Sequence, residues 1–129
     1  MPTERRPLDH QLVAQVGRPE EDVVAWWKSR FEQIAAIPSA TARAGALVPE
    51  WRELAALKEA DRALLTRARI LGAMRLTQEQ QDTISEARDL AKQQVPAVAA
   101  GDAAFIRDKV AATLPPDAQR QVTERLARE

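Results

Sequence analysis

Residues 20–37, EEDVVAWWKSRFEQIAAI, carry the apolar spacing that most restricts the fold of this chain. Apolar residues recur there every three or four positions, which is the period of one helix face. This stripe consists of Val23, Val24, Trp27, Phe31, Ile34 and Ala35. Pro19 suits the first position of a helix, and Pro38 ends it. We therefore expect an amphipathic helix from about residue 20 to residue 37, with Trp27 in the core.

The neighbouring Trp26 lies about 100° around the helix axis from Trp27, on the side of Arg30 and Ile37. Two interpretations follow from this position. Another element of the same domain covers Trp26, or Trp26 anchors a partner or a second copy of the chain. The sequence leaves both open.

The composition extends the helical prediction to the whole chain. Aromatic residues make up 4%, there are 4 glycines and no tyrosine, and helix-favouring residues dominate. Thr77 and Gln80 form a capping box that starts another helix, and Pro96, Gly101–Asp102 and Pro115–Pro116 interrupt the chain after it. We expect an all-α fold, an irregular bundle of about five or six helices with two long central helices. Residues 1–129 form one domain in this prediction, with residues 1–7 as a flexible arm.

The longest helix is expected from about Pro49 to Arg75. Its seam alternates steps of three and four residues and contains one charge, Asp61, among Leu54, Leu57, Leu64, Ala68 and Leu71. Asp61 either reaches water or an arginine of a neighbouring helix, or sets the register of a self-association interface. Trp51, Ile70 and Met74 fall outside the seam, which indicates that this helix is covered on more than one side.

The residues needed for common active sites are scarce. The chain has one histidine, His10, no cysteine, and 4 scattered glycines. These residues supply no nucleophile with an oriented base, no zinc ligand set and no phosphate-binding loop. We therefore expect a protein without catalytic residues, metal or cofactor, although the sequence leaves enzymatic activity open.

The charge of the chain indicates which partners it could bind, and its hydropathy indicates where in the cell it resides. With 19 basic and 19 acidic residues, the chain has no net charge that would attract nucleic acid or a membrane. Four arginines, Arg62, Arg67, Arg69 and Arg75, lie within one segment as candidate anion contacts, and they make nucleic-acid binding a minor alternative. No apolar run spans a bilayer, no secretory signal is visible, and the absence of cysteine fits a reducing compartment, so we expect a cytoplasmic protein.

One short motif resembles a known family. Residues 76–80, LTQEQ, match the Leu-Thr-x-x-Gln motif of the periplasmic Spy and CpxP family of helical stress chaperones. Residues 114–126 resemble a degraded second copy, with Pro115 in place of the threonine and one extra residue before Gln119. The resemblance implies a dimeric helical cradle that binds unfolded client proteins.

Together these features favour a non-enzymatic helical interaction module, either a small subunit or adaptor of a larger assembly or a homo-oligomer. The reason is that, judged from the sequence, we expect the apolar helix faces to exceed the area that a small bundle can bury. The partner-binding candidates are Trp26, Arg30, Ile37, Trp51, Asp61, Ile70 and Met74. The alternative from another class is an enzyme or small-ligand binder with an inter-helix pocket lined by Trp26, Trp51 and Asp61.

Overall fold

The computed structural model describes residues 12–128, and this part of the chain contains six α-helices and no strand. The helices are α2 (Glu20–Ala35), α3 (Ala40–Ala56), α4 (Glu59–Met74), α5 (Gln78–Gln94), α6 (Pro96–Phe105) and α7 (Pro116–Ala127). A π-helical turn, η2 (Ile106–Val110), and a 3-10 turn, η3 (Ala111–Thr113), join α6 to α7. The predicted all-α bundle is confirmed. The predicted arm, residues 1–7, and His10 lie outside the described residues.

Helix α2 follows the prediction closely. Three acidic residues occupy its first turn, where the helix dipole favours negative charge. Trp27 is 0% exposed, so its predicted place in the core is confirmed. Trp26 is partly buried against the same core, with its ring centroid 4.9 Å from that of Trp27. Its other neighbour is Arg30, whose guanidinium carbon lies 5.6 Å from the Trp26 ring centroid.

The predicted single helix over residues 49–75 is wrong, because the chain breaks at Leu57 and Lys58. Both residues are extended, with ψ angles of 160° and 148°. The first of the two resulting helices, α3, starts at Ala40, where the Ser39 hydroxyl accepts a hydrogen bond from the Ala42 N–H at 3.2 Å. Pro49 therefore lies inside α3 and not in a first turn.

The predicted leucine seam is only partly present, since Ala68 is buried and Leu71 packs on the core but Leu64 does not. Leu64 is 61% exposed, whereas the buried face of this helix contains Leu65, Thr66, Ala68, Arg69, Ile70 and Gly72. Asp61 lies in the first turn of α4, where its charge interacts favourably with the helix dipole. Its position in the sequence therefore reflects a helix start and not a charge within a seam.

The interruptions later in the chain are partly as predicted. Helix α5 ends at Gln94 and Pro96 begins α6, while Pro115 precedes α7. The predicted stop at Gly101–Asp102 is wrong, since α6 runs through both residues and continues into the π-helical turn.

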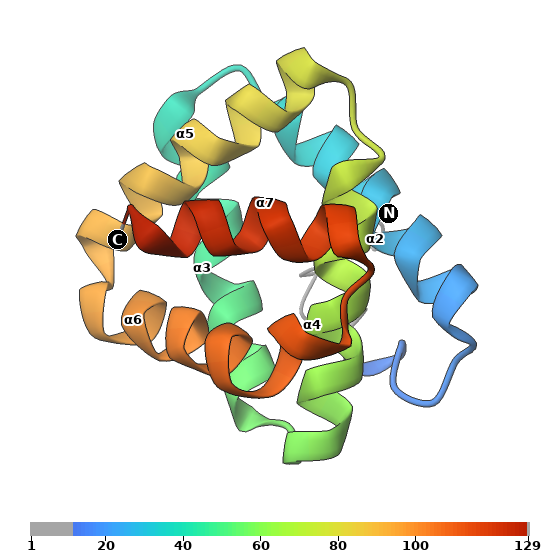
Figure 1. Ribbon diagram of the computed structural model, residues 1–129. Helices are drawn as coiled ribbons and strands as arrows, with labels where there is room; N and C mark the ends of the chain where they lie inside the picture. The colour runs from blue at the N-terminus through green and yellow to red at the C-terminus, as the bar shows by residue number, and fades with distance from the viewer. Residues whose placement is uncertain (1–11, 129) are drawn as a thin grey trace.

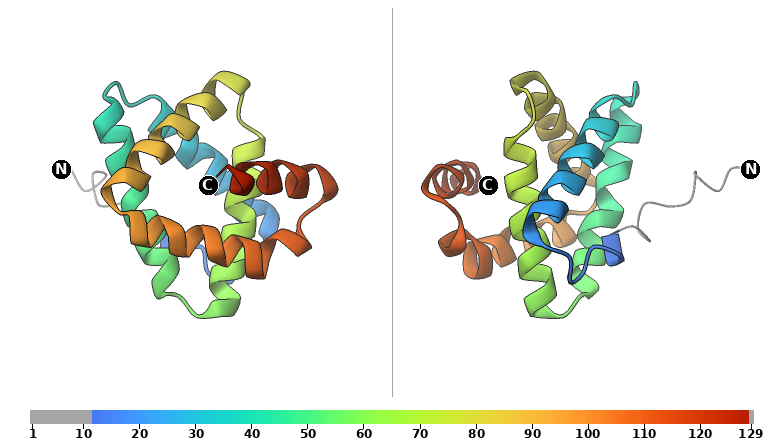
Figure 2. Two further views of the ribbon diagram at one scale, coloured as in Figure 1. Left: turned by 60° about the vertical axis from the view of Figure 1, so that its left-hand side comes forward. Right: turned by 90° about the vertical axis from the view of Figure 1, so that its right-hand side faces the viewer.

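The helices pack in a crossed arrangement that places α7 on the outside (Figure 1). Helix α2 packs mainly on α4, and α3 packs mainly on α5. In the right-hand view of Figure 2, α4 lies between α2 and α7. One core cluster joins α2, α3, α4 and α5, and a smaller one joins α4, η2 and α7 through Ile70, Ile106, Val110, Leu114, Ala118 and Val122.

The expected excess of apolar surface is not present in residues 12–128. Val13 and Leu64 are the exposed large hydrophobic residues of this part of the chain, at 57% and 61% exposure. Trp51 and Ile70, which the sequence placed off the main seam, are buried by neighbouring helices of the same chain. Within the described residues, no helix combines the length and the apolar character needed to cross a bilayer.

Candidate ligand-binding cavity

A cavity of about 290 Å³ lies among α4, α5, α6 and α7. Figure 1 shows α7 crossing in front of the space framed by the other three helices. The inner end of the cavity reaches Glu50 and Trp51 of α3 and Phe31 of α2. Five helices separated in sequence thus contribute side chains to one concave site, together with Phe31 from a sixth.

One part of the cavity wall is apolar. Trp51, Ile70 and Ile84 are buried residues from three different helices, and they line the cavity together. Met74 of α4 and Leu126 of α7 continue this surface and are partly buried. A ligand in the cavity would therefore contact the aliphatic side chains of Met74 and Leu126 as well as polar groups.

Two buried ion pairs lie at or beside the cavity. Arg69 of α4 donates to both carboxylate oxygens of Asp102 of α6, at 2.9 and 3.1 Å. Glu50 of α3 accepts a hydrogen bond from the Nε of Arg30 of α2. All four side chains are buried. Burial raises the pKa of the Glu50 carboxyl above its ordinary value of 4.5, while the Arg30 guanidinium acts in the opposite direction.

Arg88 of α5 also lines the cavity, and its electrostatic position differs from that of Arg69 and Arg30. Among residues 12–128 it has no hydrogen-bond or ion-pair partner. Burial, and then the positive charges of Arg125 and Arg69, lower the pKa of its guanidinium to about 9, while Asp102 and Asp89 act in the opposite direction. At neutral pH the guanidinium therefore stays protonated, and its repulsion by Arg125 and Arg69 exceeds its attraction to Asp102 and Asp89. The side chain is half-buried.

The structure brings together some of the residues predicted from sequence and separates others. Trp51, Ile70, Met74 and Arg69 line the main cavity. Trp26, Arg30 and Ile37 are not among its lining residues, and Arg30 is buried in its pair with Glu50. A pocket joining Trp26, Trp51 and Asp61 is not formed in the described part of the chain.

Asp61 instead lines a second cavity of about 210 Å³ between the start of α4 and the segment before α2. Leu64, the most exposed large apolar residue described, lines it as well. Val16 and Val23 complete its apolar surface.

The four arginines proposed as anion contacts are engaged within the chain. Arg67 pairs with Glu20 at 2.8 Å and donates to the carbonyl of Thr113. Arg75 pairs with Glu21, and Arg69 with Asp102. Arg62 stacks on Phe105, with its guanidinium carbon 4.1 Å from the ring centroid. These contacts tie α4 to α2, α6 and the turns before α7 and leave no free arginine cluster in residues 12–128.

Sequence reasoning missed Arg88, Glu50 and Asp102 as parts of a site. Arg88 lies in a stretch rich in charged and polar residues, Glu86-Ala87-Arg88-Asp89, which has the pattern of a solvent-exposed helix face. It becomes half-buried because it lines a cavity to which α4, α6 and α7 also contribute; Figure 1 shows α7 between α5 and α6, in front of α3 and α4. A weak signal was present for Asp102, since a single carboxylate in an otherwise apolar helix needs a partner.

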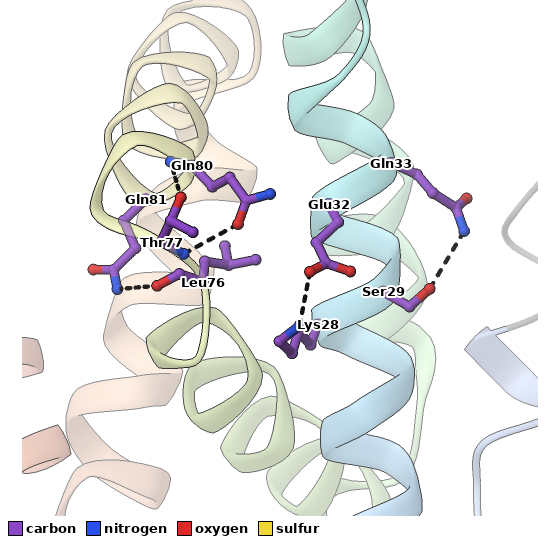
Figure 3. Close-up of polar contacts among 8 residues, drawn as sticks. All are labelled: Lys28, Ser29, Glu32, Gln33, Leu76, Thr77, Gln80 and Gln81. Carbon is purple, nitrogen blue, oxygen red and sulfur yellow. Dashed lines mark hydrogen bonds and ion pairs between the residues drawn. The ribbon is translucent and has the colours of Figure 1, made fainter.

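The motif at residues 76–80 is a local helix start. The Thr77 hydroxyl accepts from the Gln80 N–H at 3.1 Å, and the Gln80 side chain accepts from the Thr77 N–H at 3.0 Å, as Figure 3 shows. This is the predicted capping box, and it is confirmed. Gln81 adds a hydrogen bond to the carbonyl of Leu76. Capping accounts for Thr77 and Gln80 of the motif that resembles the Spy and CpxP family, and Leu76 is buried in the core.

Comparison with protein-family models finds no match, and comparisons with curated proteins and with solved structures find none either. The assignment of a function therefore depends on the cavity and its chemistry.

Proposed function

We propose that this protein binds a small molecule in the cavity among α4, α5, α6 and α7. The observation that supports this most is the combination of an apolar wall with a charged side chain, Arg88, that has no partner in the described chain. Concave sites with mostly apolar walls and a few polar groups are typical of ligand pockets. The volume of about 290 Å³ lies at the small end of their range.

The proposal concerns binding, and it includes no reaction. It develops the sequence-based alternative of an inter-helix pocket with a different set of residues. A cytoplasmic location remains part of the proposal, because a chain with no cysteine fits a reducing compartment. Fractionation of the native host would test that location separately.

The proposed function can be tested with a substitution that places a larger side chain in the cavity. Ala103 of α6 is partly buried and lines the cavity, whereas Ala100 of the same helix is exposed and is not part of the lining. Ligand-observed NMR with a fragment set of anionic, neutral and cationic compounds should detect binding to the natural sequence. Ala103→Leu should abolish that binding, and the matched control Ala100→Leu should preserve it. If no fragment of any charge binds, or if Ala103→Leu changes nothing, the proposed function is wrong.

A second candidate is the interaction module predicted from sequence. The observation that favours it is the exposure of Leu64 beside the cavity of about 210 Å³ near the start of α4. Contiguous exposed apolar surface marks protein interaction sites, and Leu64 lines this cavity together with the partly buried Val16. Sedimentation of the natural chain and of Leu64→Lys tests this candidate, as described in the Discussion.

A further inference from the structure

We infer that the ligand of the main cavity is a small organic carboxylate, with its charged group held by Arg88 and its apolar body against the partly buried Met74 and Leu126. This inference rests on the proposed function and specifies the chemical class that the site takes. It follows from the pairing of the charges, the geometry of a guanidinium and the nature of the wall.

The charges around the cavity leave a positive excess at Arg88. Asp102, a nearby carboxylate, already accepts two hydrogen bonds from Arg69. Glu50 is occupied by Arg30. The other acidic residues of the lining, Asp82 and Glu124, are exposed, so solvent screens their charges. An anion entering the cavity would therefore meet a cation that lacks a strong internal counter-charge.

Leaving this charge uncompensated is unfavourable for the empty protein. An unpaired charge in a partly dehydrated site destabilises the folded state, and the two neighbouring arginines, Arg69 and Arg125, increase the repulsion. A bound carboxylate removes this penalty. Its two oxygens also match the planar fork of a guanidinium, which donates two parallel hydrogen bonds.

The apolar part of the cavity lining favours the binding of an organic anion over that of an inorganic anion. Inorganic phosphate or sulfate would satisfy Arg88 but would leave the exposed parts of Met74 and Leu126 against water. A carboxylate with a short hydrocarbon or aryl group would cover that surface, and burial of apolar area adds roughly 25 cal/mol per Å² to its affinity. The small volume excludes long chains, so benzoate and hexanoate are suitable probes.

The test compares charged and neutral ligands of one shape on three proteins. Calorimetric titration with benzoate, benzamide and inorganic phosphate is carried out on the natural sequence, on Arg88→Met and on Arg120→Met. Methionine keeps an unbranched side chain and good helix propensity. Arg120 is the matched control, because it is an exposed residue of α7 that pairs with Asp117 and is not part of the cavity lining.

We expect benzoate to bind the natural sequence about 10- to 100-fold more tightly than benzamide, as hydrogen bonds to charged groups imply. Phosphate should bind more weakly than benzoate. Arg88→Met should remove the preference for benzoate and leave benzamide within roughly twofold, since both share the apolar contacts. Arg120→Met should behave as the natural sequence does.

A stability readout separates a binding role of Arg88 from a structural one. Without ligand, Arg88→Met should raise the midpoint of thermal unfolding by about 3–5 °C, since each kcal/mol shifts a domain of this size by about that much. A residue that only supported the fold would lower it. Arg88→Lys keeps the positive charge but lacks the planar guanidinium, so it should bind benzoate with intermediate affinity. This variant also serves as the test if Arg88→Met does not fold.

The inference is overturned if benzoate and benzamide bind equally, if neither benzoate nor hexanoate binds, or if Arg88→Met leaves benzoate affinity unchanged. The proposed function survives these outcomes when neutral fragments bind and Ala103→Leu abolishes their binding. The proposed function fails, and the inference with it, when fragments of every charge fail to bind or when Ala103→Leu leaves their binding unchanged.

Discussion

Arg88 and Glu50 have in common that their environment is set by helices far from them in the chain. Arg88 is one of many charges in α5, and it shares a cavity with residues of α4, α6 and α7. Glu50 of α3 is paired with Arg30 of α2. Their consequences differ. Glu50 has a partner and is buried, so its protonation contributes to stability. Arg88 has no partner in the described residues and is suited to binding.

The pH dependence of stability tests the environment of Glu50. Since burial raises its folded-state pKa above the unfolded value of 4.5, the native state binds more protons between those two values. Stability contributed by Glu50 should therefore increase as pH falls from neutral toward 4.5. The measurement is urea unfolding at several pH values for the natural sequence and for Glu50→Gln, which does not titrate.

The difference between the two proteins isolates Glu50, because other groups titrate in both. The natural sequence should gain stability relative to Glu50→Gln on acidification. A difference that moves the other way would mean that the ion pair with Arg30 outweighs burial and holds the pKa of Glu50 below 4.5.

At the scale of elements, the contact of α2 with α4 depends on one glycine. A Cβ atom added at Gly72 would lie 2.8 Å from the Val24 carbonyl oxygen and 2.9 Å from the Trp27 Cβ. Both are too close, and neither can move without shifting α2. We expect Gly72→Ala to reduce the free energy of unfolding by about 1–3 kcal/mol, as overpacking does.

Gly45, inside α3, provides the control, because a Cβ there would meet nothing within 4 Å. Gly45→Ala should stabilise the protein by about 0.5–1 kcal/mol through helix propensity. Chemical denaturation of both variants decides the matter. Equal effects of the two substitutions would show that α2 and α4 do not approach each other closely at Gly72.

Some elements could be predicted because a short stretch of sequence is enough to indicate where they begin or end. The stripe of α2, the capping box at Thr77 and the breaks at Pro96 and Pro115 are short-range patterns, and the structure confirms them. The break between α3 and α4 was missed because Lys58 makes no capping hydrogen bond through its side chain. No glycine or proline marks that break. The two acidic residues at the start of α4 were the remaining signal.

The cavity was harder to predict because no local pattern describes it. Of its charged residues, Arg69 was noticed as a possible anion contact, and the structure places it in an ion pair instead. Its counter-ion Asp102 was misread as a helix stop, and Arg88 was not considered. All three depend on the arrangement of α4, α5, α6 and α7, which pair residues about 15 to 35 positions apart in sequence.

At the scale of the whole molecule, the described chain covers most of its own apolar surface, so we expect a monomer of 14.3 kDa in solution. Sedimentation velocity measures this directly. A dimer that Leu64→Lys converts to monomer would instead support the interaction candidate. Trp26→Ala tests the original anchor of that candidate, and we expect it to leave the mass unchanged because Trp26 packs on Trp27 and Arg30.

The most direct test of the central claim is a crystal structure of the protein with benzoate. We predict that the carboxylate lies among α4, α5, α6 and α7, with both oxygens about 2.7–2.9 Å from the Arg88 guanidinium and the ring against Met74 and Leu126. An empty cavity in saturating benzoate, with Arg88 instead paired to Asp82 or Glu124, would contradict the claim that this arginine is held ready for a ligand.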